Sequence, residues 1–429
     1  MMEIRNPVLR DYIRQYQEIY SSFTEQVEQF GLLFAPDREE ELRALRSELR
    51  TLGISERNEG ASLVHGEVCG ACAACRTGID SYTGILSLMC HRSCFFCFNP
   101  NQTEFEDYSG ATKDWQTELK NQHRRNPKMK YIALTGGEPL LHREDCVAYF
   151  RMARSLWPEA SLRLYTSGDL LDADLLDALR GEGLEEIRFS IKLDDIPERS
   201  EKVWRNLAMA REYIPRVMVE MPVMPDAEEE MKGILARLEE LGIYGINLLE
   251  LCFPYHNAEE FRKRGYALRW PPYRTLYNFW YAGGLPVDGS EAVALKLLRE
   301  AVQKQYRLSV HYCSLENKHF GQVYQQNLNA MPEDGTFVMS EKDFYLKTIK
   351  VFGRDMKEAE RLFRARQRTD FSTGRDFLRC SPACAMLLKK KDMELGISYN
   401  IREFRDGESV IRELRIDPIR ASEFDEAML

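Results

Sequence analysis

Short apolar runs recur through the middle of the chain and alternate with amphipathic stretches. Six runs have the length and composition of buried strands: GILSLM (84–89), KYIALT (130–135), LRLYTS (162–167), EIRFSIK (186–192), RVMVEMPV (216–223) and GINLLELC (245–252). YRLSVHYC (306–313) is a candidate for a seventh strand. The intervening segments, such as REDCVAYFRMARSLW, have helical period. This alternation predicts an α/β fold whose strands run parallel with right-handed crossovers.

The two ends of the chain have a different pattern. Residues 1–65 predict a charged helical extension, and a cysteine-rich segment at 66–80 precedes the strand–helix region at 81–330. Residues 331–429 combine a helical stretch with two strand candidates, ISYNIREF and VIRELRI. We therefore predict a small α+β subdomain at the C-terminal end.

Composition narrows the class of protein. The 429 residues are 44% hydrophobic and 30% charged, which indicates a globular protein with a sizeable core. The formal net charge of −9 argues against a general nucleic-acid binder, which needs a basic surface. The first residues lack the apolar core of a secretory signal, and no window approaches the ~18 consecutive apolar residues of a membrane span. We expect a cytoplasmic protein that does not interact with membranes.

Eleven cysteines are too many for packing alone and too clustered for a disulfide framework. Eight of them fall into three tight groups, which are Cys69/Cys72/Cys75, Cys90/Cys94/Cys97 and Cys380/Cys384. In a reducing compartment, clustered thiols favour metal binding or redox chemistry.

The stretch MCHRSCFFCFNP carries three of these cysteines, Cys90, Cys94 and Cys97, directly after the first predicted strand. A four-iron cluster that only carries electrons has a thiolate on each iron, whereas three cysteines leave one iron open to a substrate. Phe96, just before the last cysteine, can shield such a cluster and offer a face to a purine. The alternative is a zinc site completed by His91 or by a distant cysteine.

This loop, followed by TGGEP after the second predicted strand, resembles the radical S-adenosylmethionine (radical SAM) superfamily. The resemblance covers roughly residues 80 to 313 and implies a partial (β/α)6 barrel. It implies that the three cysteines ligate a [4Fe–4S] cluster and that S-adenosylmethionine chelates the fourth iron. It also implies reductive cleavage of S-adenosylmethionine to a 5′-deoxyadenosyl radical, which abstracts hydrogen from a substrate.

Residues after later strands fit the same cofactor. Gly136 and Gly137 allow the backbone to approach a ligand closely. Glu138 is an acceptor suited to the methionine ammonium, and Pro139 stiffens the exit from the turn. The further candidates for binding ribose or carboxylate, each resting on a single residue, are Ser167, Ser190, Lys192 and Glu220.

The segment VCGACAACRTG supplies Cys69, Cys72 and Cys75. These thiols predict an auxiliary iron–sulfur cluster with a fourth ligand from elsewhere, and zinc is the alternative. The candidates for the fourth ligand are Cys313, Cys380 and Cys384. Together with VHYCSLENK and a hairpin-like tail, the segment is similar to a branch of radical SAM proteins related to pyruvate formate-lyase activating enzyme. That similarity implies one metal site formed by Cys72, Cys75 and Cys313, with Cys69 as the fourth member.

The predicted rim of the barrel offers three candidate catalytic residues, Cys252, Tyr255 and His311, although each is more often a structural residue. We predict a radical SAM enzyme, with oxidoreductase- or lyase-type radical chemistry, that acts on a peptide or protein side chain. The alternatives are a radical SAM enzyme for a small molecule or natural-product intermediate, and a non-catalytic iron–sulfur or zinc protein that retains the barrel. The expected reductant is an electron-donor protein such as flavodoxin or ferredoxin.

Overall fold

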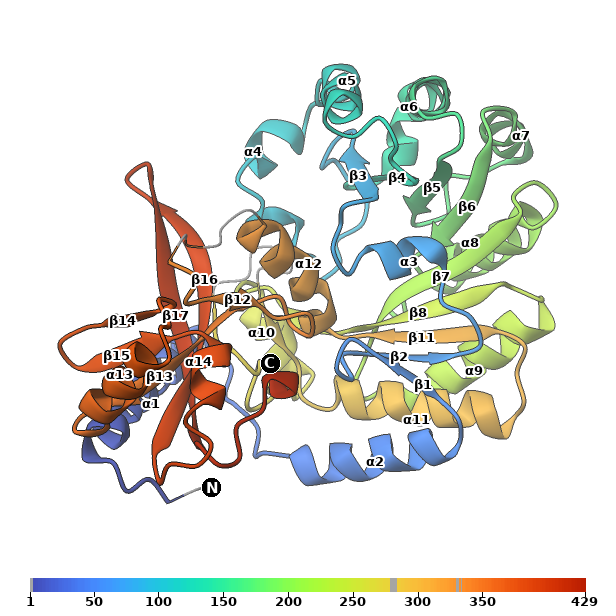
Figure 1. Cartoon of the computed structure of the whole chain (residues 1–429). Coiled ribbons are helices and arrows are strands. Elements are labelled where there is room, and N and C mark those ends of the chain that lie inside the picture. Colours follow the sequence, from blue (N-terminus) through green and yellow to red (C-terminus); the bar gives the residue numbers. More distant parts are fainter. Residues whose placement is uncertain (1–2, 278–283, 329–331, 333) are drawn as a thin grey trace. The chain divides into compact units, whose positions relative to one another are not determined.

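The computed structural model describes residues 3–277, 284–328, 332 and 334–429, and the chain folds as two compact units (Figure 1). The larger unit comprises Gly31–Pro272 and Phe279–Lys318, and the smaller one comprises Met1–Phe30, Tyr273–Asn278 and His319–Leu429.

A nine-stranded sheet forms the frame of the larger unit, in the order β1-β2-β11-β8-β7-β6-β5-β4-β3. The seven strands from β11 to β3 are all parallel to their neighbours, and β2 and β1 extend the sheet in antiparallel pairing. Their bounds are β1 Ser55–Arg57, β2 Ser62–His65, β3 Ser81–Ile85, β4 Tyr131–Thr135, β5 Ser161–Thr166, β6 Leu184–Phe189, β7 Arg216–Val223, β8 Gly245–Glu250 and β11 Ser309–Cys313. A short pair, β9 Cys252–Phe253 and β10 Leu285–Pro286, lies outside this sheet.

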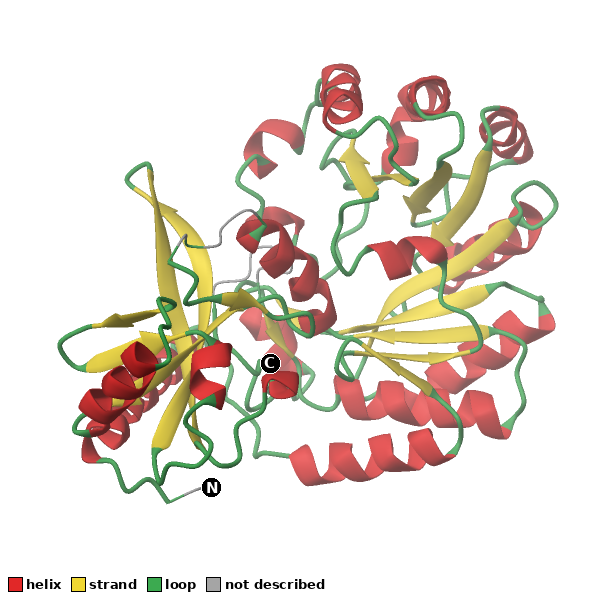
Figure 2. Cartoon of the chain, viewed as in Figure 1, coloured by secondary structure: helices red, strands yellow, loops and turns green. Residues whose placement is uncertain are grey.

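Helices between the strands cover one side of the sheet (Figure 2). These are α5 Trp115–Arg125, α6 Arg143–Leu156, α7 Ala173–Gly181, α8 Pro197–Ala210, α9 Glu228–Glu240 and α11 Ser290–Gln303. The remaining helical segments that begin in this unit are α2 Glu39–Thr51, α3 Gly70–Ala74, η1 Asn99–Asn101, α4 Phe105–Tyr108, η2 Pro139–His142, α10 Ala258–Lys263 and α12 Leu315–Asn327.

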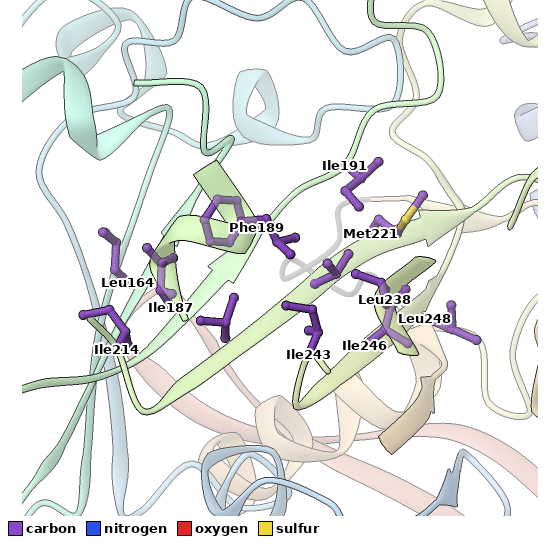
Figure 3. Packing of buried hydrophobic residues seen from close by; sticks show 14 of the residues in the cluster. Leu164, Ile187, Phe189, Ile191, Ile214, Met221, Leu238, Ile243, Ile246 and Leu248 are labelled. Carbon is purple, nitrogen blue, oxygen red and sulfur yellow. The ribbon is translucent and has the colours of Figure 1, made fainter. Parts of the chain in front are cut away.

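Side chains alternate between the two faces of the sheet along each central strand. In β7, Val217, Val219 and Met221 belong to the main hydrophobic core, whereas Met218 packs in a separate small cluster with Cys69. The core lies between the sheet and its helices, and Figure 3 shows Leu164, Phe189 and other members packed there. The other face, which we call the inner face, is polar. It carries Arg163, Tyr165, Glu186, Arg188, Glu220, Asn247, His311 and Cys313.

The seven predicted parallel strands are confirmed, with one shift in position. The first was predicted at 84–89, but β3 pairs with β4 only through Ser81–Ile85. The chain then leaves the ladder, because the Leu88 amide donates to the Tyr108 carbonyl and the Ser87 carbonyl accepts from Gly137. Cys90 therefore does not follow the strand directly, as predicted, but comes after a short irregular segment.

The smaller unit is built on a six-stranded antiparallel sheet in the order β14-β15-β13-β16-β17, with β12 paired to β13. Its strands are β12 Val338–Met339, β13 Leu346–Phe352, β14 Phe371–Thr373, β15 Phe377–Cys380, β16 Glu394–Arg405 and β17 Glu408–Arg420. Its helical segments are α1 Pro7–Glu28, α13 Asp355–Ala365, α14 Pro382–Met386 and η3 Glu426–Met428. The predicted strands ISYNIREF and VIRELRI lie within β16 and β17.

The structure groups the N-terminal residues differently from the predicted ranges. Helix α1 belongs to the smaller unit, where Leu9 packs in a cluster with Phe352 and Ile416. The hydroxyls of Tyr12 and Tyr16 both donate to Glu413 on β17, each at 2.6 Å. Helix α2, by contrast, belongs to the larger unit. Among the described residues, none of the helices combines the length and apolar character that a membrane crossing requires.

Candidate active site and inner-face thiols

The cysteine loop is fixed to the GGEP turn by backbone hydrogen bonds. The Gly137 amide donates to the Ser87 carbonyl at 2.9 Å, and the Glu138 amide donates to the Met89 carbonyl at 2.8 Å. The side chain of Asn99 adds a 3.0 Å hydrogen bond to the Gly136 carbonyl from the far side of the loop. The segments on either side of the three cysteines are therefore anchored to one turn at the carboxyl end of β4.

The two glycines of this turn are needed for that contact. A Cβ on Gly137 would lie 2.0 Å from the Met89 carbonyl oxygen, and one on Gly136 would lie 2.3 Å from the Ser87 carbonyl oxygen. Gly136 also has φ of +136°, a conformation that side chains disfavour. The prediction ascribed these glycines to close approach of a ligand. In the structure, the close approach is made by the chain's own backbone.

Glu138 is buried, with 2% of its surface exposed, and its carboxylate is held within the chain. Oε2 accepts hydrogen bonds from the amide and the hydroxyl of Ser167, both at 2.6 Å. Oε1 accepts from the Thr166 hydroxyl at 2.7 Å and from the Leu140 amide at 3.1 Å. A carboxylate has about four acceptor positions. Glu138 therefore joins the end of β4 to the end of β5. Its acceptor positions, which the sequence analysis assigned to the methionine ammonium, are occupied by hydrogen bonds from the chain itself.

Two residues inside the cysteine loop clamp it to the ends of β5 and β6. His91 Nε2 lies 2.9 Å from Asp169 Oδ2, and Arg92 Nη2 lies 3.3 Å from the same oxygen. Arg92 also pairs with Asp195, and its side chain is only 4% exposed. Burial alone would raise the pKa of Asp169, but the hydrogen bonds from Ser167 and His91 and the charge of Arg92 lower it. The charged clamp thus keeps Asp169 ionised beside the loop.

The residues expected to contact the adenosine part of the cofactor lie beside the loop. Lys192 Nζ is 5.4 Å from the centroid of the Phe96 ring and donates a 2.6 Å hydrogen bond to the Ser190 hydroxyl. Burial raises the pKa of Cys97, and the positive charge of Lys192 acts in the opposite direction. An aromatic face, a cation and a hydroxyl therefore lie close to one another near the last cysteine, and their contact with the cofactor stays a prediction.

The three thiols of this loop suit a cationic cluster. Burial raises the pKa of Cys90, and the nearby Glu138, Cys94 and Cys97 raise it further. A positive iron–sulfur core would stabilise the thiolates that this environment disfavours, so the donor set fits the [4Fe–4S] cluster. Within the described ranges, no group of three Cys, His, Asp or Glu side chains is arranged to hold a single metal ion.

A second group of thiols lies on the inner face of the sheet. Arg188 on β6, which is 2% exposed, donates hydrogen bonds to Cys69 Sγ at 2.8 Å and to Cys72 Sγ at 3.4 Å. The hydrogen bond from Cys69 and the charge of Arg188 lower the pKa of Cys72 well below the ordinary thiol value, against the effect of burial. The buried guanidinium of Arg188 thus contacts the sulfurs of both Cys69 and Cys72.

Polar residues of neighbouring strands complete the surroundings of these thiols. Asn247 Nδ2 donates to Cys72 Sγ at 3.4 Å and to Glu220 Oε2 at 2.7 Å. Glu220 also accepts from Arg188 at 2.6 Å, so it belongs to this network and not to the cofactor site for which it was predicted. His311 bonds to Asn247 through Nδ1 at 3.0 Å.

His311 does not lie at the rim of the barrel, where a catalytic role was predicted for it. Its Nε2 lies 2.8 Å from the hydroxyl of Ser62 on β2, and the residue is 4% exposed. Both ring nitrogens are therefore engaged, and the ring contributes to the low pKa of Cys72. The structure places His311 behind the inner-face thiols.

Cys75 and Cys313 lie close enough to this pair to interact with it electrostatically. The charge of Cys72 raises the pKa of Cys75, and burial raises it more. Burial raises the pKa of Cys313 to about 12, with smaller contributions from Cys75 and Cys72, while Asn317 donates to its sulfur at 3.2 Å. Electrostatic interactions thus link Cys75 and Cys313 to Cys72, and a metal site formed by these cysteines stays a prediction.

The other candidate cysteines are placed elsewhere. Cys380 and Cys384 are core residues of the smaller unit, where Cys384 Sγ donates to Asp370 Oδ1 at 3.3 Å. Cys252 is buried on β9, and burial raises its pKa to about 12. Tyr255 follows two residues after β9, and burial raises its pKa to about 12 as well. Both groups are therefore neutral near pH 7.

Sequence reasoning missed the residues that organise both sites. Arg188 lies inside the quoted strand EIRFSIK, and an arginine in an otherwise buried strand is a detectable signal because it demands a partner. Asp169 and Asp195 lie in the TSGD and KLDD stretches that follow β5 and β6. Their pairing with Arg92 could not be read from the sequence, because the partners are about 80 and 100 residues apart.

Known protein families identify the class of protein that the chain resembles. Residues 85–238 match the family model of the radical SAM superfamily. Residues 85–238 are therefore similar to radical SAM domains, whose cofactors are a [4Fe–4S] cluster and S-adenosylmethionine. The predicted resemblance and its partial parallel barrel are confirmed.

Individual proteins are also similar to this chain. A protein of Methanocaldococcus jannaschii named "putative glycyl-radical enzyme activating enzyme" is 25% identical over 307 residues, covering 68% of this chain and 76% of that protein. Among solved structures, Streptococcus suis SuiB bound to S-adenosylmethionine is 10% identical with a TM-score of 0.40, covering 55% of this chain and 50% of SuiB. AnSMEcpe with bound AdoMet and the Cp18Cys peptide is 18% identical with a TM-score of 0.32, covering 41% of this chain and 51% of that one. This chain thus spans about half the length of these solved proteins.

Proposed function

We propose that this protein is a radical SAM enzyme that abstracts hydrogen from a peptide or protein substrate. The observation that carries the proposal is the anchoring of the cysteine loop to the GGEP turn through Gly137 and Glu138. A loop that only filled space would not need two glycines whose Cβ atoms would overlap its backbone. The cluster and S-adenosylmethionine, when bound, supply reductive cleavage to a 5′-deoxyadenosyl radical.

The chain's own residues would hold and shield these groups. Cys90, Cys94 and Cys97 would be the cluster ligands, and their geometry is set by the clamp of Arg92. Phe96 would offer its ring to the adenine, with Lys192 and Ser190 beside it as polar partners. Asn101 donates a 2.8 Å hydrogen bond to the Pro254 carbonyl, which joins the segment after the cysteines to the chain that follows β9. In the proposed reaction, the protein would hold the target C–H bond in position beside the bound groups.

A protein substrate is supported by the activating-enzyme relative, because an activating enzyme of that name acts on another enzyme. A small-molecule substrate is the second candidate, and a non-catalytic iron–sulfur protein is the third. The intact GGEP turn, with both of its glycines in close contact with the loop, argues against the third.

The first experiment tests catalysis itself. The anaerobically reconstituted protein is mixed with S-adenosylmethionine and dithionite, and 5′-deoxyadenosine is measured by mass spectrometry. We expect its formation in the wild type and its loss in the Cys90→Ala/Cys94→Ala/Cys97→Ala variant. A wild-type protein with a full cluster and no 5′-deoxyadenosine would contradict the proposal.

The second experiment tests the class of substrate. Cells of the source organism are grown in deuterated medium, and their extract is separated by size. Each fraction is added to the enzyme, and deuterium in 5′-deoxyadenosine is measured. We expect transfer from the macromolecular fraction and its loss after protease treatment but not after nuclease treatment. Transfer only from the small-molecule filtrate would identify the second candidate instead.

A further inference from the structure

A polar cavity of about 330 Å³ lies at the amino ends of the parallel strands in the larger unit. Its lining includes Tyr131, Ser161 and Arg216, which are the first residues of β4, β5 and β7. Gly70 and Ala71 of helix α3 form another part of its wall. Small-molecule sites in proteins have volumes of about 300–1,000 Å³. The cavity is therefore large enough for a ligand the size of a small metabolite.

This cavity is separate from the candidate active site. The cysteine loop bonds to turns that follow β4, β5 and β6, at the carboxyl ends of the strands. Strand β5 runs over six residues, Ser161–Thr166, so its two ends are about 17 Å apart at ~3.3 Å per residue. A ligand in the cavity would therefore occupy a second site, away from the thiols of the loop.

Three charged residues of adjacent strands form a row along the cavity. Arg163 on β5 pairs in register with Glu186 on β6, and Glu186 pairs in register with Arg216 on β7. One carboxylate thus lies between two guanidinium groups, but its 2.7 Å hydrogen bond comes from Arg188. Its oxygens are 3.6 Å from Arg163 Nη1 and 3.9 Å from Arg216 Nε, so neither of these two arginines has a hydrogen bond to it.

Arg163 is a buried cation whose donors are not all used. The residue is 6% exposed, and within the described part of the chain its Nε has no hydrogen-bond partner. Arg216, by contrast, donates from Nη2 to the Ser161 hydroxyl at 3.3 Å and to Glu185 at 3.4 Å. A guanidinium has five N–H donors, and burying one without a partner is unfavourable. A ligand that supplied acceptor oxygens would remove this cost.

We propose that the cavity binds the carboxylate group of a small organic acid, with Arg163 as the main binding residue and Arg216 beside it. The planar guanidinium matches the two oxygens of a carboxylate. Glu159 and Glu186 also line the cavity, so a phosphate, with a charge of about −1.5 to −2, would meet more repulsion than a singly charged carboxylate. The lining therefore favours an organic acid over phosphate.

Helix α3 closes the cavity through a contact that requires glycine. A Cβ on Gly70 would lie 2.2 Å from the hydroxyl oxygen of Tyr131. Glycine at this position therefore allows α3 to lie against the start of β4. A bound acid would touch both the helix and the strands, and it would hold α3 against the sheet.

The test measures binding of small acids to the anaerobically reconstituted full chain by isothermal titration calorimetry. The probes are lactate and benzoate, each compared with its neutral amide, lactamide or benzamide, at constant ionic strength in chloride. We expect at least one of the acids to bind with a Kd of about 1 mM or tighter. Its amide and inorganic phosphate should each bind at least about tenfold more weakly, because the first lacks the charge and the second carries too much of it.

Variants locate the binding. Arg163→Met should weaken binding of the acid at least about tenfold, and Arg163→Lys should weaken it less, because lysine keeps the charge but not the planar donors. Both variants should fold, since Glu186 keeps its hydrogen bond from Arg188, and circular dichroism verifies this. Arg43→Met is the matched control, because it removes an arginine of α2 whose side chain is 70% exposed, and it should leave the Kd unchanged.

Four outcomes would overturn the proposal. They are no binding of either acid, equal affinity for an acid and its amide, tighter binding of phosphate than of the acids, and binding that Arg163→Met does not change. Neither S-adenosylmethionine nor a reductant is present, so the result does not depend on the proposed radical reaction. Failure of that reaction would show separately, as a wild-type protein that holds its full iron but forms no 5′-deoxyadenosine.

Discussion

The amide of Glu138 donates a 2.8 Å hydrogen bond to the carbonyl of Met89, the residue directly before Cys90. The turn that carries the GGEP sequence therefore sets the starting point of the cysteine loop. The two motifs are about 45 residues apart in the chain, and this contact joins them.

The close contact predicts the effect of Gly137→Ala. The added Cβ would lie 2.0 Å from the Met89 carbonyl oxygen, so the loop must move and the three thiols with it. We expect iron retained at the first cluster and 5′-deoxyadenosine formation each to fall at least about tenfold, which corresponds to ~1.4 kcal/mol. Gly181→Ala is the matched control, because its Cβ would meet no atom within 4 Å. Wild-type iron and activity in Gly137→Ala would show that the loop is not held by this turn.

The saturated carboxylate of Glu138 predicts a loss of stability in Glu138→Gln. The amide nitrogen of glutamine cannot accept a hydrogen bond, so a buried donor of Ser167 or Thr166 loses its partner. Leaving such a donor unsatisfied costs about 1–3 kcal/mol. The free energy of unfolding in urea measures this cost. Glu229→Gln, a surface residue whose side chain is 85% exposed, should change it by less than about 0.5 kcal/mol.

The ion pairs of Arg92 predict that substitutions at Arg92 and at Asp195 have non-additive effects on the free energy of unfolding. Arg92→Met should lower the free energy of unfolding by about 3–5 kcal/mol, because it removes the buried guanidinium that pairs with both Asp195 and Asp169. The double variant Arg92→Met/Asp195→Asn should be less destabilised than the sum of the single variants. Arg180→Met, which removes an exposed pair with Asp177, should cost under about 1 kcal/mol. Additive effects of Arg92→Met and Asp195→Asn would contradict the pairing.

The smaller unit provides a prediction about pH. Burial alone would raise the pKa of Glu394, but hydrogen bonds from the amides of Arg5 and Asn6 lower it. Because the folded state depresses this pKa, the carboxylate stabilises α1 above the unfolded value of about 4.3, and that contribution is lost as the pH falls through the folded value. Glu394→Gln should therefore destabilise the protein at pH 7.

The difference in the free energy of unfolding between Glu394→Gln and the wild type should shrink steadily as the pH is lowered below about 4. Urea unfolding at each pH measures this difference. The control is Glu408→Gln, at the exposed start of β17, which should not alter the pH dependence. A difference that stayed constant with pH would indicate that the charge of Glu394 does not hold α1.

Much of the larger unit could be predicted because its signals are local. Each parallel strand is a short apolar run, so the residues from KYIALT to SVHYC were assigned to the correct elements. The end of the first strand was misplaced, because Leu88 and Met89 are apolar enough for a strand. Only the hydrogen bonds of Ser87, Leu88 and Met89 to distant segments remove these residues from the ladder. Helix α1 was grouped with its sequence neighbours, but its tyrosines bond to Glu413, some 400 residues away.

The sequence by itself determined the class of chemistry, because it contains the spacing of Cys90, Cys94 and Cys97 and the glycines of TGGEP, whatever the fold. Only the tertiary structure decided what surrounds them. In the folded chain, Glu138 accepts hydrogen bonds from Ser167 and Thr166, and Arg188 donates hydrogen bonds to Cys69 and Cys72 on the inner face. The partner of a buried charge depends on which strands, far apart in sequence, lie side by side in the fold. A local sequence pattern does not contain this information, so the partner could not be predicted.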